Sequence, residues 1–325
     1  MKKLILVFIT IVFFISTLSI SSYATDKVIF DDKVEINEWD TYNYIISKSD
    51  EELLKLGLDL DEIKEIRNFS FEDEIRRRAD LTDEELYAYG YSDKKITNLR
   101  SIATKKHISE ANLRDISENS LTTALRYIDN GLYIASPTVS LYYVDFQYEW
   151  EWENSTLMTF TDRIAISFNS LGGSQYNHTF VGGYKLVYYL RDLSTYEETI
   201  ATADWKTFES NVLSFYADFP VGVRDFTHDL KYFAYRGYGK FRLQNDSPQM
   251  RFYLMAAYGH SIIMLTPDYS FGINEDDGLP TINFSWYLDE QHCGGIVEKD
   301  FTVIPGNIYF GYLWGKNGTG GKKPG

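Results

Sequence analysis

The sequence has 325 residues, of which 44% are hydrophobic, and its formal net charge is −15. This length allows one large or two ordinary globular domains with buried cores, and the aromatic content of 16%, with 26 Tyr, favours β-structure. Because an acidic surface repels phosphate backbones, the charge argues against nucleic acid as a partner.

Residues 1–24 have the composition of a secretory signal peptide. Two lysines precede an apolar run at residues 4–20, and small residues stand at Ser22 and Ala24, the positions that signal peptidase reads. We therefore expect cleavage between Ala24 and Thr25 and a secreted, extracellular product, which meets a membrane only through the signal peptide before cleavage. An uncleaved anchor is the alternative, although the apolar run is short for a spanning helix.

Residues 25–130 are predicted to form a helical region. All seven Pro lie at Pro137 or later, and only three of the 22 Gly precede that residue. A long segment without Pro and with little Gly is typical of helices.

Two segments of this region, 49–68 and 82–101, match each other without gaps at an offset of 33 residues. Each begins with a hydroxyl residue that is followed three positions later by Glu, the pattern of a capping box. Gly57 and Gly90 then end the first helix of each unit in the left-handed conformation, and a second helix follows. The duplicated helix–Gly–helix hairpin is interpreted as part of a small helical bundle, or alternatively as a duplicated unit that binds a peptide or protein partner.

From residue 136 to residue 314 the hydrophobic pattern changes to a period of two, and it is clearest at 142–153. A strand sends successive side chains to opposite faces, so this segment predicts one aromatic face and one acidic face. Similar segments separated by turn residues predict an antiparallel β-sandwich or jelly-roll-like domain of about eight strands. Residues 205–215 are also compatible with a helix, and the Gly- and Lys-rich tail at 315–325 is expected to be disordered.

The aromatic face of segment 142–153 includes Tyr148, Trp150 and Trp152. These rings are candidates for ligand binding, because exposed aromatic rings stack on sugars. The alternative is that they form the core face, which we expect because burying aromatic rings is favourable whereas burying the carboxylates of the opposite face is costly. That opposite face carries Glu149, Glu151 and Glu153.

The polar residues of the β region show no recognised catalytic or metal-binding pattern, so no metal and no cofactor is expected. The His residues of this region are His178, His228, His260 and His292. None has the spacing of a zinc site. Cys293, the single cysteine, is adjacent to His292, and neighbours in a strand point to opposite faces, so an inert thiol is expected. Residues 274–278 could wrap a calcium ion but are expected to form a solvated turn.

The sequence thus predicts an α+β protein, with an N-terminal helical region followed by an antiparallel β-sandwich or jelly-roll-like domain. The favoured function is non-enzymatic binding of an unknown extracellular ligand, such as a wall component, a glycan or a protein. The alternatives are a toxin-like or pore-forming β protein, or a glycan-active enzyme of unrecognised type. A polar strand pair that detaches from the core would favour pore formation, and a pocket that gathers Asp or Glu with His260 would favour an enzyme.

Overall fold

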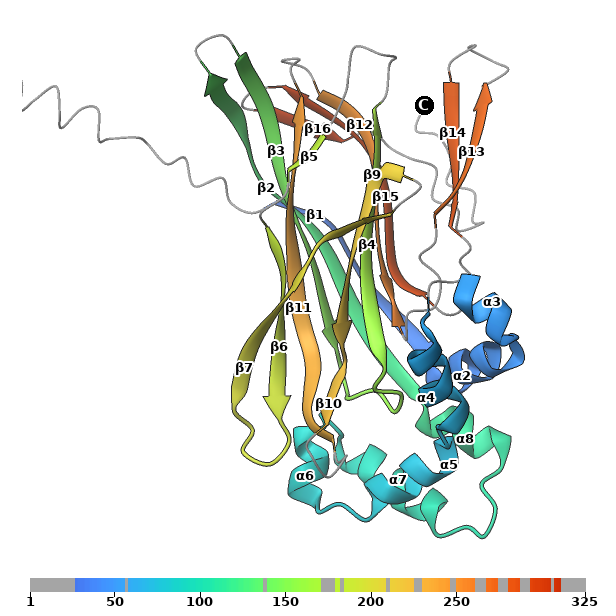
Figure 1. The fold of residues 1–325 in the computed structure, drawn as a ribbon. Coiled ribbons are helices and arrows are strands. Elements are labelled where there is room, and N and C mark those ends of the chain that lie inside the picture. The colour runs from blue at the N-terminus through green and yellow to red at the C-terminus, as the bar shows by residue number, and fades with distance from the viewer. Residues whose placement is uncertain are drawn as a thin grey trace, which may run out of the picture.

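The computed structural model describes most of the chain beyond residue 26. The described residues are 27–55, 58–136, 139–170, 179–181, 184–208, 211–224, 230–245, 250–260, 267–273, 280–286, 293–304 and 307–310. They form helices and antiparallel β-sheets, as predicted for an α+β protein (Figure 1).

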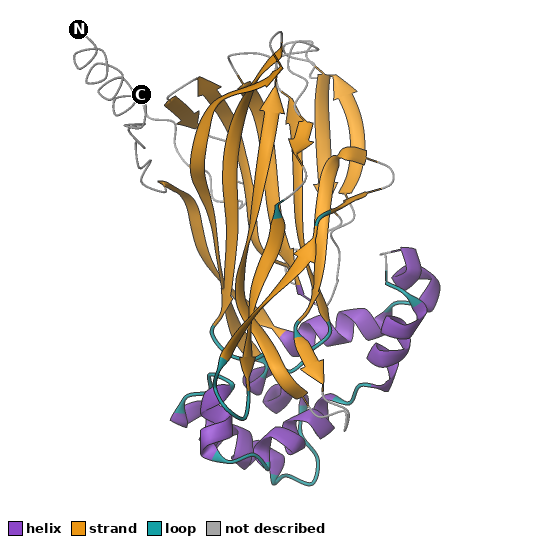
Figure 2. Ribbon diagram, turned by 60° about the vertical axis from the view of Figure 1, so that its left-hand side comes forward, coloured by secondary structure: helices purple, strands orange, loops and turns teal. Residues whose placement is uncertain are grey.

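The helices follow one another along the chain and gather at one end of the sheets (Figure 2). They are α2 (Glu38–Ser47), α3 (Asp50–Lys55), α4 (Leu60–Asn68), α5 (Phe71–Ala79), α6 (Asp83–Ala88), α7 (Asp93–Ala103) and α8 (Glu110–Ile116). Among the described residues, no helix has both the length and the apolar composition needed to cross a membrane.

The helix ends follow the local sequence. Asp59 caps α4 and Thr82 caps α6, each in a capping box with a Glu three residues later. Gly90 follows α6 with a φ of 83°, and a Cβ at this position would lie 2.8 Å from the backbone oxygen of Glu153. The predicted left-handed conformation of Gly90 is therefore confirmed. Gly57 lies outside the described residues, so the duplication of the hairpin stays a prediction.

Two large sheets make up the β part of the described chain. The first has the strand order β1-β2-β3-β11-β6-β7, and the short strands β5 and β10 also pair with β11. Its strands are β1 (Lys27–Asn37), β2 (Glu118–Ser136), β3 (Val139–Trp152), β5 (Thr179–Val181), β6 (Lys185–Asp192), β7 (Glu198–Asp204), β10 (Gly222–Arg224) and β11 (Leu230–Asn245).

The second sheet has the order β16-β15-β12-β4-β9-β8. Its strands are β4 (Thr161–Ser170), β8 (Lys206–Phe208), β9 (Asn211–Pro220), β12 (Met250–Gly259), β15 (Cys293–Ile304) and β16 (Asn307–Phe310). The remaining two described strands, β13 (Pro267–Ile273) and β14 (Pro280–Trp286), form a separate two-stranded sheet.

The strands begin earlier in the chain than the sequence indicated. The prediction of helix across 25–130 was wrong at both ends, because β1 and the first part of β2 lie there and pair with each other. Low Pro and Gly content is compatible with long strands as well as helices, which explains the error. The helix considered at 205–215 is also absent, since β8 and β9 occupy the described part of that range.

Part of the core lies between the two large sheets, where aromatic rings of both sheets pack against one another. Trp150 on β3 packs against Phe219 on β9 with their ring centroids 5.0 Å apart, and Phe215 packs against Phe241 on β11 at 5.8 Å. Gly237 on β11 lies opposite Trp150, and a Cβ there would come within 2.2 Å of the Trp150 ring. The missing side chain at Gly237 therefore makes room for the indole.

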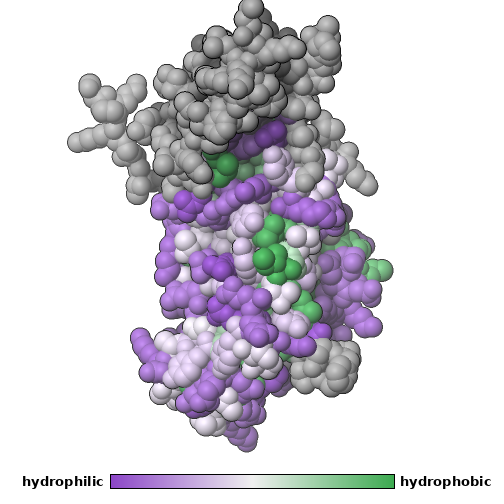
Figure 3. Space-filling model, turned by 90° about the vertical axis from the view of Figure 1, so that its left-hand side faces the viewer, coloured by the Kyte–Doolittle hydropathy of each residue, from purple (hydrophilic) through white to green (hydrophobic). Residues whose placement is uncertain are grey.

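The described part of one face of the molecule is mainly polar. Figure 3, which views the side on which β6 and β7 lie in Figure 1, shows hydrophilic side chains over most of the described face and a small apolar cluster near its middle. On β3 the acidic set faces outward: Glu151 is exposed and Glu149 is half-buried. This arrangement is the one predicted from the alternation and from the cost of burying carboxylates.

A buried arginine joins the helices to the β part of the chain. Arg78 on α5 is completely buried, and its guanidinium lies 2.7 Å from a carboxylate oxygen of Glu74 and 2.6 Å from the hydroxyl of Tyr91. It also donates to the carbonyl of Ser155 at 3.1 Å and to that of Thr156. Because both carbonyls follow β3, this arginine fixes the helical region against the end of the core.

Candidate functional site

The hairpin β13–β14 is an insertion between two strands that are neighbours in the second sheet. β12 pairs directly with β15, and Gly259 at the end of β12 lies opposite Cys293 at the start of β15. The segment that contains the hairpin thus lies, in the sequence, between two paired ends of neighbouring strands. Among the described strands β13 and β14 pair only with each other, and in Figure 1 they stand apart from the large sheets.

The register of this hairpin separates apolar from small polar positions. Tyr269 is opposite Phe284 and Phe271 is opposite Ile282, whereas Ser270 is opposite Asn283. The other polar pairs are Asp268 with Ser285 and Gly272 with Thr281, and the other apolar pairs are Pro267 with Trp286 and Ile273 with Pro280. Because alternate positions of a strand belong to opposite faces, the pairs assign all apolar residues to one face and all small polar residues to the other.

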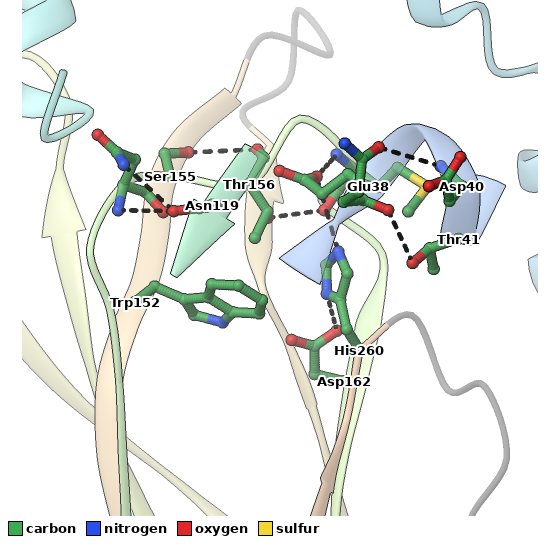
Figure 4. A network of polar contacts seen from close by, with 12 residues as sticks. Glu38, Asp40, Thr41, Asn119, Trp152, Ser155, Thr156, Asp162 and His260 are labelled. Carbon is green, nitrogen blue, oxygen red and sulfur yellow. Dashed lines mark hydrogen bonds and ion pairs between the residues drawn. The ribbon is translucent and has the colours of Figure 1, made fainter. Parts of the chain in front are cut away.

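His260 is the last described residue before this hairpin, and it is completely buried. Its Nδ1 lies 2.9 Å from Oδ1 of Asp162, near the start of β4, and its Nε2 lies 3.7 Å from Oε2 of Glu38 in the first turn of α2 (Figure 4). Burial acts to lower the pKa of His260, but the adjacent carboxylates of Asp162 and Glu38 outweigh it and raise the pKa to about 10. The imidazole is therefore positively charged at neutral pH.

The histidine belongs to a longer buried network. The hydroxyl of Tyr258 donates to Asp162 and accepts a hydrogen bond of 2.9 Å from Nε1 of Trp152. Burial, followed by the charge of Asp162, raises the pKa of Tyr258 well above its usual value, so the phenol stays protonated. At the other end, the backbone N–H of Met158 donates to Glu38 at 2.9 Å. One network thus connects β3, β4, β12 and α2 at the base of the insertion.

The burial of this network argues against a catalytic role. The structure does bring two carboxylates to His260, which is the feature that would have favoured an enzyme. However, His260 and Asp162 are 0% exposed and Glu38 is 2% exposed, so a substrate has no access to their polar atoms. We conclude that the cluster holds the end of β12 in place, next to the point where the hairpin leaves the sheet.

The residues singled out from the sequence have separate locations. Tyr148, Trp150 and Trp152 are buried in the core, where Trp152 joins the His260 network through its indole N–H. Cys293 is the first residue of β15. The residues that lie outside the described part of the chain are Ala24, Thr25, His178, His228, His292 and the possible calcium loop at 274–278. Within the described part, no cluster of His, Cys, Asp and Glu is arranged to hold a metal ion.

Sequence reasoning missed the two carboxylates that contact His260. Asp162 is 98 positions away in the chain, and Glu38 comes from the segment that was predicted to belong to a separate helical region. Neither has a local motif that distinguishes it from a surface carboxylate. The alternation of residues 280–286, in contrast, is visible in the sequence and marks half of the hairpin.

The similarity of this chain to solved structures is weak. No family model matches the sequence, and no curated protein matches it. The NetB toxin of Clostridium perfringens in its membrane-inserted form is 10% identical over 59% of this chain and 94% of that chain, with a TM-score of 0.20. The KRT10-binding region domain of the pneumococcal serine-rich repeat protein PsrP is 12% identical over 51% of this chain and 89% of that chain, with a TM-score of 0.21. The Clostridium perfringens delta-toxin is 8% identical over 58% and 86%, with a TM-score of 0.17. At these scores the similarity assigns neither a fold family nor a function.

Proposed function

We propose that the protein is a secreted, pore-forming β protein that inserts the hairpin β13–β14 into a membrane. The observation that carries the proposal is the hairpin itself: it is amphipathic by register and pairs with no other described strand. We interpret the two facing sheets as a β-sandwich that forms the body of the soluble molecule. This proposal places the alternative function above binding, which the sequence alone favoured.

The pattern of the hairpin matches the requirements of a strand that crosses a bilayer. Such strands alternate apolar residues toward lipid with polar residues toward an aqueous interior, and they need roughly 9–11 residues. In the sequence the alternation extends to Leu265 and Leu288, which gives nine positions in each of the segments 265–273 and 280–288. Both strands are therefore long enough, by sequence pattern, to span the hydrocarbon layer when tilted.

A single hairpin cannot cross a membrane alone, because the outer edge of each strand would expose unpaired N–H and C=O groups to lipid. Each such group costs several kcal/mol, so neighbouring copies must supply the missing hydrogen bonds. The proposed active form is consequently a ring of identical chains in which hairpins pair edge to edge. The position of the hairpin between β12 and β15 is compatible with insertion into a membrane. If β13 and β14 move, no described hydrogen-bond ladder of the two large sheets is broken.

Dye release from lipid vesicles tests the proposal with a matched pair of variants. Phe284→Arg places a cation on the face that would meet lipid, which costs about 2–4 kcal/mol per chain near the bilayer centre. Asn283→Arg makes the same substitution one position away, on the face that would line the pore. We expect the wild-type protein and Asn283→Arg to release dye and Phe284→Arg to release little.

Thermal melting supplies the control for folding, because the hairpin lies off the two large sheets and neither substitution should change the melting temperature. Absence of dye release by the wild-type protein from vesicles of several lipid compositions would contradict the proposal. Equal release by the two arginine variants would also contradict it, since the two faces of the hairpin would then be equivalent.

A further inference from the structure

An open cavity lies on the outer face of the first sheet, away from the hairpin and from the His260 network. Its volume is about 410 Å³, and it extends across five neighbouring strands from β1 to β6. One cross-strand row contributes Thr122, Glu151, Arg236 and Tyr189, and the next row contributes Ala124, Glu149 and Tyr238. The row between them contains Trp150 and faces the core, so these two rows point outward. We name this cavity the outer basin.

Three charged groups of the outer basin, Arg126, Glu149 and Arg236, are held by contacts with neighbouring side chains. Nε of Arg126 donates to Glu149 at 2.7 Å. The guanidinium of Arg236 lies 4.5 Å from the ring centre of Tyr189, and it donates to Glu198 at 3.1 Å. Groups that are already oriented lose little conformational freedom when a ligand binds, which favours affinity.

Hydrogen-bonding capacity nevertheless remains unused. Among the described residues, no group donates a hydrogen bond to the exposed carboxylate of Glu151. Burial acts to lower the pKa of Arg236, but Tyr235, Glu198 and, to a smaller extent, Glu151 outweigh it and raise that pKa. The basin thus offers a spare acceptor, the carboxylate of Glu151, beside the rings of Tyr189 and Tyr238.

This combination selects the chemical class of the ligand. Asp31, Glu149 and Glu151 oppose Arg126 and Arg236, so the lining carries one net negative charge and disfavours anions. A cationic ligand is disfavoured because it would be repelled by the cations that already lie near both tyrosine rings, Arg236 at 4.5 Å from the centre of Tyr189 and Lys240 at 5.8 Å from that of Tyr238. A neutral sugar fits both constraints, since its hydroxyls donate to carboxylates and accept from guanidinium while its C–H face packs on a tyrosine ring.

We propose that the outer basin binds a neutral saccharide. A cavity of this size accommodates a small ligand, because pockets for such ligands have volumes of roughly 300–1,000 Å³. The site goes beyond the proposed pore and does not depend on it. If both exist, saccharide binding would hold the protein at a glycosylated surface before the hairpin inserts.

Binding to soluble sugars, without any membrane, tests this site separately from pore formation. The full chain, purified after export, is applied to an array of neutral and sialylated oligosaccharides, and the best neutral binder is then titrated calorimetrically. Glu151→Ala should weaken binding at least tenfold. Glu197→Ala removes an exposed carboxylate in the turn between β6 and β7, outside the basin, and should leave the affinity unchanged.

Three results would overturn the proposal: no neutral oligosaccharide binds, only sialylated ones bind, or Glu151→Ala binds as tightly as the wild-type protein. Both substitutions are on exposed positions, so melting temperatures should stay at the wild-type value and exclude misfolding. Tyr238→Ala provides a second test, since loss of the ring should weaken sugar binding without affecting dye release from vesicles. Dye release that persists when sugar binding fails would leave the pore proposal intact.

Discussion

Replacing His260 by Gln should change how the stability of the protein depends on pH. The pKa of His260 is raised from 6.5 to about 10 in the folded state, chiefly by Asp162 and Glu38 acting against burial. Each unit of such a shift corresponds to about 1.4 kcal/mol, so the charged histidine contributes up to about 5 kcal/mol. Because the folded pKa is the higher one, this contribution is complete below pH 6.5 and is lost as the pH rises toward 10.

Urea unfolding, followed by tryptophan fluorescence, measures this effect as a difference between two proteins. Burial lowers the pKa of Lys95 to about 8. Because the folded pKa is the lower one, Lys95 makes the free energy of unfolding rise with pH above this value, which partly masks the loss caused by His260 in the wild-type profile. Lys95 is present in both proteins, so subtracting the His260→Gln profile removes it. We expect the wild-type advantage to be largest near pH 6.5 and to shrink by several kcal/mol toward pH 10. Parallel profiles would refute the assigned role of His260.

Three substitutions test how the body of the molecule is held together. Trp150→Ala should lower the free energy of unfolding by about 3–5 kcal/mol, measured by urea denaturation, because it leaves a cavity between the sheets; an unchanged stability would contradict its place in the core. Gly90→Val should cost at least about 1–2 kcal/mol in the same assay, since a side chain meets the backbone oxygen of Glu153 and φ is positive; wild-type stability would argue against this geometry. Arg78→Met should destabilise by about 3–5 kcal/mol, because it leaves buried carbonyls and Glu74 without their shared donor; a neutral result would show that the helices do not depend on this arginine.

Local patterns predicted much of the secondary structure. The alternation at 142–153 identified β3, and the relative cost of burying aromatic rings and carboxylates identified its core face. The capping boxes that begin at Ser49 and Thr82 marked the starts of α3 and α6. These predictions were correct because the alternation of a strand and the cap of a helix depend on residues that are close in the sequence.

Long-range pairing could not be read in the same way. β1 was assigned to a helical region because its strand conformation depends on hydrogen bonds to β2, which lies about 80 residues later in the chain. For the same reason, the polar and apolar positions of β14 were visible, but its separation from the large sheets was not. The contacts of His260 with Asp162 and Glu38 depend on three distant segments meeting at one point, and no spacing in the sequence encodes that meeting.

The insertion of the hairpin can be observed directly with a fluorophore whose emission reports on its surroundings. Cys293 is the single cysteine of the chain, so a Cys293→Ser background allows one new cysteine at a time at Ile282, Asn283, Phe284 or Ser285. After the labelled proteins are mixed with vesicles, the probes at Ile282 and Phe284 should shift to the emission of a lipid environment. The probes at Asn283 and Ser285 should retain an aqueous emission, which gives an alternating pattern along β14. Aqueous emission at all four positions, or a shift without alternation, would contradict the account of this hairpin as a membrane-crossing element.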